Sequence, residues 1–65
     1  MLVGMNGDRL KGARVAKLLT QGELAALLGV SVGTISAWER GVQEPRLRMI
    51  RKLTQALGVS VSDLA

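Results

Sequence analysis

The sequence predicts an all-α fold, a compact bundle of five helices, and three observations support this. Large apolar residues recur at helical spacing, most regularly at Leu47, Ile50, Leu53 and Leu57. Serine, threonine, aspartate and glycine stand at the edges of the apolar segments, where helices begin and end. The chain has only 65 residues, so it has room for one hydrophobic core. We therefore expect a single domain built from short helices.

The first helix is predicted to begin near Asp8, because a carboxylate is favourable at the positive end of a helix. Gly12 lies inside this helix and costs about 1 kcal/mol relative to alanine. Residues 1–7 contain no periodic pattern, so we expect a flexible N-terminal arm there. The folded domain is then expected over residues 8–65.

A capping box predicts the second helix. The hydroxyl of Thr20 can accept a hydrogen bond from an unpaired backbone N–H, and Glu23 can reach back to the N–H of Thr20. The helix should begin at Gln21 and end at Leu28, because Gly29 tolerates the positive φ that often follows a helix.

Ser31 predicts the start of a third helix, with Ile35 and Trp38 on its buried side. We interpret Trp38 as a core residue without a functional role. Four residues of this helix are left for an outward surface: Val32, Gly33, Ser36 and Ala37. Two short helices joined by Leu-Gly-Val-Ser have the spacing of a helix-turn-helix DNA-binding unit, so the outward surface would face DNA.

Two further helices are predicted after residue 45. Pro45 suits the first position of a helix that runs from about Arg46 to Leu57 and ends at Gly58. Ser60 and Asp63 repeat the capping arrangement and predict a last short helix. This helix should fold Val61 and Leu64 back toward the core.

Composition narrows the possible functions. The chain has no cysteine and no histidine, which excludes thiol and imidazole catalysis, disulfides and the usual zinc ligands. We expect no enzyme activity, no cofactor, no metal and no small-molecule ligand. The net charge of +4 favours a polyanionic partner. Only one residue is aromatic, which favours duplex DNA over single strands. No apolar stretch is long enough to cross a bilayer, and we expect a cytoplasmic location without membrane binding.

From Arg9 to Leu64 the chain resembles the Cro/cI-type, or XRE-type, helix-turn-helix family, which includes the lambda-type phage repressors. The resemblance lies in Thr20-Gln21, Glu23-Leu24-Ala25, Leu28-Gly29-Val30-Ser31, Thr34-Ile35-Ser36, Trp38-Glu39-Arg40-Gly41, Pro45 and Leu57-Gly58-Val59-Ser60. It implies a compact, lambda-repressor-like five-helix domain. Such a domain would bind double-stranded operator DNA as a homodimer, with the second helix of the motif in the major groove.

The resemblance also assigns site residues. It implies that Gln21 hydrogen-bonds a phosphate at a helix N-terminus and that Thr34 lies near the phosphate backbone. It places Val32, Gly33, Ser36 and Ala37 opposite base edges. It pairs Arg14 with Glu39 in a salt bridge, which we expect to be partly exposed and to contribute little stability.

Two arginines remain open to two interpretations. Arg40 can cap helix carbonyls or reach a phosphate. Arg46 follows Pro45 at a helix start and can lie near a phosphate or simply in solvent. We include both among the expected DNA contacts.

Val32 and Gly33 carry no hydrogen-bonding side chain, so direct base readout should be poor and DNA shape should matter more. Together with Leu27, which we expect to face solvent, they leave a second hypothesis open. In it, the same fold is a protein-interaction module, of the scaffold or toxin-neutralising type. The leading hypothesis is a transcriptional repressor.

Overall fold

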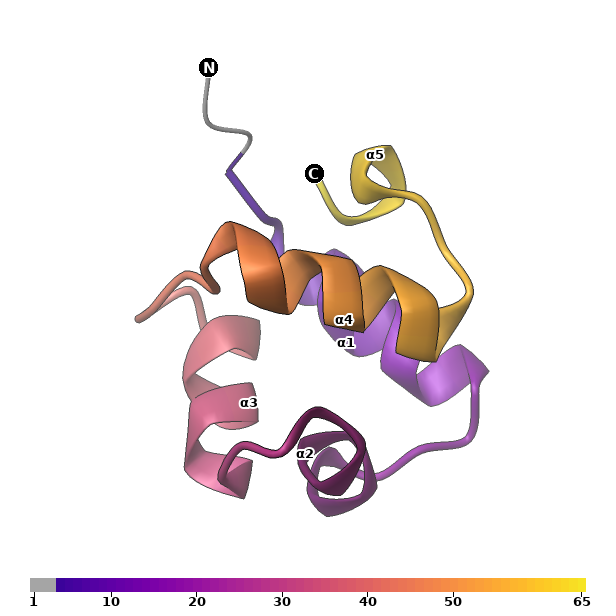
Figure 1. The fold of residues 1–65 in the computed structure, drawn as a ribbon. Helices are drawn as coiled ribbons and strands as arrows, with labels where there is room; N and C mark the ends of the chain where they lie inside the picture. Colours follow the sequence, from indigo (N-terminus) through magenta and orange to yellow (C-terminus); the bar gives the residue numbers. More distant parts are fainter. Residues whose placement is uncertain (1–3) are drawn as a thin grey trace.

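A computed structural model describes residues 4–65, and within that range the chain is entirely helical with short connections, as predicted. In Figure 1, α4 lies in front of α1 and runs in a similar direction, whereas α3 stands at one end of the molecule and α2 is seen nearly end-on. Their bounds are α1 Gly7–Ala16, α2 Gln21–Leu28, α3 Val32–Glu39, α4 Leu47–Leu57 and α5 Val61–Leu64.

Every helix contributes to one core. α1 contributes Leu10, α5 contributes Leu64, and Trp38 of α3 is 3% exposed, as expected for a core residue. The other buried apolar side chains are Leu24, Ala25, Leu28, Ile35, Leu53 and Leu57. With several fully buried leucines, packing of apolar surface is the main source of stability available to this chain.

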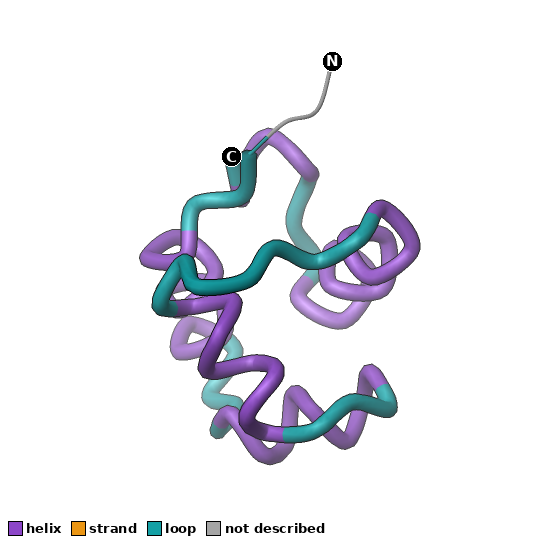
Figure 2. Tube along the Cα trace, turned by 90° about the vertical axis from the view of Figure 1, so that its left-hand side faces the viewer, coloured by secondary structure: helices purple, strands orange, loops and turns teal. Residues whose placement is uncertain are grey.

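The start of α1 differs from the prediction. The helix begins at Gly7, and its N-cap is Asn6, whose side-chain oxygen accepts from the backbone N–H groups of Asp8 and Arg9 at 2.9 and 3.2 Å. The backbone N–H of Asn6 also donates to the carbonyl of Leu64 at 2.6 Å. The beginning and the end of the described chain therefore lie side by side (Figure 2).

The flexible arm predicted over residues 1–7 therefore includes residues that belong to the folded domain. Met5 packs against the core and Asn6 is fixed by the bonds just described. Residues 1–3 of that predicted arm lie outside the described residues.

The capping residues of α2 and α3 have the predicted roles. The hydroxyl of Thr20 accepts from the N–H of Glu23 at 3.0 Å, and the Glu23 carboxylate accepts from the N–H of Thr20 at 2.8 Å. Gly29 ends α2 with φ at +71°. Ser31 caps α3 by accepting from the N–H of Thr34 at 3.2 Å. These caps fix where α2 ends and where α3 begins.

α4 departs from the prediction in two ways. It begins at Leu47 with Arg46 as N-cap, so Pro45 stands before the helix and not at its first position. Leu47 is 66% exposed, whereas Leu53 and Leu57 are buried and Ile50 is half-buried. The apolar stripe therefore begins outside the core, and only the later turns of α4 contribute fully buried side chains.

α5 follows the predicted capping box, in which Ser60 and Asp63 bond each other's backbone N–H groups. Leu64 is buried as expected, but Val61 is 43% exposed and does not fold back into the core. A helix of four residues has one inward position per turn, and Leu64 occupies it.

Candidate nucleic-acid interface

A buried ion pair joins α1 to the end of α3. Nε of Arg14 donates to Oε2 of Glu39 at 2.6 Å, and Nη2 donates to Oε1 at 3.1 Å. The expected pair is present, but the expectation that it is partly exposed was wrong, because the side chains are only 10% and 4% exposed. A bidentate pair in a protein interior constrains geometry far more than a surface pair.

Two further hydrogen bonds extend this pair into a network. Nη1 of Arg14 donates to the carbonyl of Leu19 at 2.8 Å, and the side-chain amide of Gln21 donates to Oε1 of Glu39 at 3.1 Å. Leu19 precedes α2 and Gln21 is its first residue. The network therefore fixes the N-terminus of α2 against the C-terminus of α3.

The network also sets the charge state of Glu39. Burial alone would raise the pKa of this carboxyl, but the hydrogen bonds from Arg14 and Gln21, with the attraction of Arg14 and Lys11, hold the pKa below its ordinary value. The hydrogen bond with Glu39 raises the pKa of Arg14, against the opposing effect of burial. Both groups are therefore charged near neutral pH.

The outward face of α3 takes no part in the core. Val32 is 52% exposed, Gly33 is exposed, and Ser36 and Ala37 are half-buried. Thr34 lies at the side of this face, where its hydroxyl shares a hydrogen bond of 3.0 Å with the hydroxyl of Ser31. The four outward positions derived from helical spacing are therefore accessible together.

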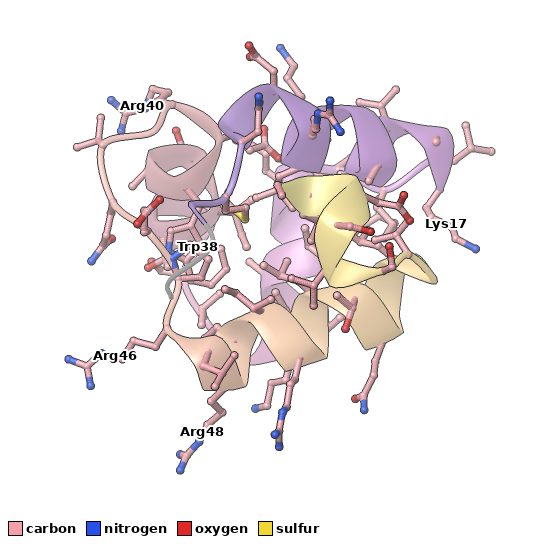
Figure 3. All side chains as sticks on the ribbon, turned by 90° about the horizontal axis from the view of Figure 1, so that it is seen from above. Lys17, Trp38, Arg40, Arg46 and Arg48 are labelled. Carbon is pink, nitrogen blue, oxygen red and sulfur yellow. The ribbon has the colours of Figure 1, made fainter. Side chains whose placement is uncertain are left out.

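Two exposed arginines lie at the α3 end of the molecule. Arg40 follows α3, and its Nε donates to the hydroxyl of Ser36 at 3.2 Å. Arg46 is the N-cap of α4 but makes no side-chain capping bond. Figure 3 shows both side chains at this end and Lys17 at the opposite end. The arginines thus stand at the two ends of the connection between α3 and α4, at that end of the molecule.

Sequence reasoning missed two features of this region. The bond from Gln21 to Glu39 joins residues with no periodic relation, so only the fold reveals it. A shallow groove of about 460 Å³ between α2 and α4 was also not anticipated. Leu27, which is 62% exposed as expected, lines the groove with Leu28, Lys52, Gln55 and Ala56.

Residues 4–65 hold no cluster of acidic side chains arranged for a metal ion. Within the same range no helix has both the length and the apolar character needed to span a bilayer.

Comparison with known proteins gives the family. A family model described as helix-turn-helix matches residues 10–64. The chain is 35% identical over 60 residues to the transcriptional repressor of the cryptic phage CTXphi from Vibrio cholerae, covering 92% of this chain and 54% of the repressor. It therefore spans about half the length of that relative.

Two further relatives match nearly end to end. An uncharacterised helix-turn-helix-type transcriptional regulator of Methanocaldococcus jannaschii is 40% identical over 57 residues, covering 88% of this chain and 86% of the regulator. The P22 c2 repressor in complex with a synthetic operator has a TM-score of 0.84 and 32% identity, covering 92% of this chain and 91% of the repressor. The chain belongs to the XRE-type helix-turn-helix family, and the three relatives just named are a transcriptional regulator and two repressors.

Proposed function

We propose that the protein is a sequence-specific transcriptional regulator, most simply a repressor, that binds duplex DNA with α3 in the major groove. The observation that carries this is the outward face of α3. It is open to solvent, lies at the end of the molecule that carries Arg40 and Arg46, and is fixed in orientation by the hydrogen bonds of Glu39. Similarity to the P22 c2 repressor, whose structure contains operator DNA, supports the same docking.

The phosphate contacts would come from positions around α3. The N-terminus of α2, at Gln21, presents backbone N–H groups and a positive dipole end to the phosphate backbone. Arg46 is exposed and without an ion-pair partner among residues 4–65, so it can neutralise a phosphate. Thr34 would lie near the backbone.

The base contacts would come from the outward face of α3. Val32 and Ala37 can contact thymine methyl groups, and Ser36 can hydrogen-bond more than one base. Gly33 adds no side chain but lets the helix backbone approach the groove floor. Apolar contacts discriminate less than bidentate hydrogen bonds, so DNA shape would add to specificity.

A homodimer would supply the remaining specificity, because one motif reads only a few base pairs. Two copies would contact half-sites roughly 34–36 Å apart in an inverted repeat. The surface we assign to the dimer contact is the side of α4 and α5 where exposed Val61 lines a shallow apolar pocket. The pocket also includes Met5, Ile50, Leu64 and Ala65.

Selection from a randomised duplex library, at near-physiological and at lower salt, tests the function. Recovery of an inverted repeat at both salts is expected, whereas binding to any sequence that disappears at higher salt would contradict it. Arg46→Ala should lower the slope of log affinity against log salt by about one. Lys17→Ala removes the same charge at the opposite end of the molecule and should leave the slope unchanged.

One observation favours a second candidate, a protein-interaction module. The groove between α2 and α4 exposes Leu27 beside the cation of Lys52. In that case Leu27→Glu would abolish partner binding, and Arg46→Ala would leave it intact. If the library selection enriches no sequence at either salt, this second candidate replaces the first.

A further inference from the structure

The outward face of α3 carries one long hydrogen-bond donor. Helical spacing of three and four residues places Gly33, Ser36, Ala37 and Arg40 along one stripe. Three of these residues are small, so Arg40 alone can reach more than a few ångströms from the helix. Figure 3 shows its side chain extending from the end of α3.

Other polar groups near this face already have partners inside the protein. The hydroxyls of Ser31 and Thr34 bond each other at 3.0 Å, and the amide nitrogen of Gln21 bonds Glu39 at 3.1 Å. Redirecting a bonded hydrogen of these groups to a base would break an existing hydrogen bond, which offsets much of the gain.

Ser36 holds Arg40 in one orientation. Side chains on a helix lean toward its N-terminus, and Nε of Arg40 donates to the hydroxyl of Ser36 one turn earlier, at 3.2 Å. The guanidinium therefore lies back along the stripe. Nη1 and Nη2 have no acceptor among residues 4–65, and these two nitrogens form the fork that matches O6 and N7 of guanine.

The small side chains beside Arg40 favour a base over a phosphate. Gly33 has no side chain, and a Cβ built there would meet nothing closer than the Ser31 hydroxyl at 3.8 Å. Ala37 adds only a methyl group. The stripe can thus approach the groove floor closely, which brings the fork to base edges. We propose that Arg40, positioned by Ser36, reads a guanine in each half-site and is the main direct base contact of α3.

This proposal rests on the DNA-binding function above, and its test begins with the operator that the wild-type chain selects. Selection with Arg40→Ala should lose its preference at one guanine position and keep the rest of the site. Discrimination at that position should fall about 5- to 150-fold, the range for a bidentate pair. Arg40→Lys keeps the charge, so it separates loss of the fork from loss of a phosphate contact.

A second measurement tests the role of Ser36. Replacing the guanine with 7-deazaguanine removes N7 and should weaken wild-type binding on the order of threefold to tenfold. Ser36→Ala should reduce this loss of affinity. Ser36→Thr, which keeps a hydroxyl, should retain it, and Arg40→Ala should abolish it. A purely structural role of Ser36 would change the thermal midpoint without changing the 7-deazaguanine penalty.

Two results would overturn this proposal while leaving the proposed DNA-binding function intact. If Arg40→Ala weakens all sequences equally and lowers the salt slope by about one, Arg40 contacts a phosphate. If Ser36→Ala leaves the 7-deazaguanine penalty unchanged, Ser36 does not position Arg40. If the wild-type chain selects no operator, the DNA-binding function and this proposal both fail.

Discussion

Oε1 of Glu39 accepts hydrogen bonds from both Gln21 Nε2 and Arg14 Nη2, each at 3.1 Å. One carboxylate at the end of α3 therefore holds side chains from α1 and α2. The recognition surface and the stability of the fold depend on the same group.

Glu39→Ala should lower the free energy of unfolding by about 3–5 kcal/mol, because it leaves the Arg14 guanidinium buried without its partner. Urea denaturation followed by circular dichroism measures the change. The double variant Arg14→Met with Glu39→Met removes both charges and should lose less stability than the sum of the losses of Arg14→Met alone and Glu39→Met alone. Additive losses would show that the two side chains act independently.

Stability should fall in acid. The pKa of Glu39 lies below its ordinary value of 4.5 in the folded protein, so the unfolded chain binds a proton more readily. The stabilisation is complete above that ordinary value and is lost as the pH falls through the folded pKa. Hydrogen bonds from Thr20 lower the pKa of Glu23, and those from Ser60 lower that of Asp63.

Thermal midpoints measured from about pH 7 to pH 2 test this sign, since carboxylates with lowered pKa values cause acid unfolding. The midpoint of the wild-type chain should decline mainly below the ordinary carboxyl range. Glu23→Gln should flatten part of that decline. A midpoint that rises on acidification would refute the assignment.

Two glycines of α1 should respond to alanine with opposite signs. A Cβ at Gly7 would overlap the backbone carbonyl group of Glu39 and lie 2.8 Å from the carbonyl oxygen of Trp38, and backbone cannot rotate away. Gly7→Ala should therefore destabilise by about 1–3 kcal/mol. Gly12 has nothing within 4 Å, so Gly12→Ala should stabilise by about 1 kcal/mol through helix propensity. Chemical denaturation of the two variants side by side gives both signs.

Leu18 is a site for stabilisation. It follows α1 with φ at +59° and is 89% exposed. A leucine side chain makes this left-handed backbone conformation unfavourable, and here it adds no packing in the core that would offset the cost. Leu18→Asn should raise the free energy of unfolding by about 0.5–1 kcal/mol, because asparagine tolerates this conformation better. Leu27→Asn, at an exposed position inside α2, is the matched control and should be neutral or slightly destabilising.

Local signals in the sequence predicted most of the fold. The caps at Thr20, Ser31 and Ser60 act over three residues, and their hydrogen bonds depend little on the rest of the chain. Asn6 also caps a helix, but the preference for a carboxylate in the first turn placed the predicted start at Asp8 instead. Periodicity predicted burial at Leu53 and failed at Leu47, because a repeat defines a face but not how far the neighbouring helices cover it.

The site was predictable only in part. Helical spacing placed Val32 and Ser36 on the outward face of α3, where the structure has them. The depth of the bond between Arg14 and Glu39, and the part that Gln21 has in it, depend on how three helices meet. No pattern within one helix contains that information.

The hydrogen bond from Asn6 to the carbonyl of Leu64 has a consequence for the order of synthesis. Contacts between α2 and α3 are local and can form while the chain is still growing. The first turn of α1 is made early but can dock fully only after Leu64 has been added. The ion pair of Arg14 and Glu39 joins α1 to α3 without the last helix, so what translation of Leu64 adds is the partner that fixes the residue before α1.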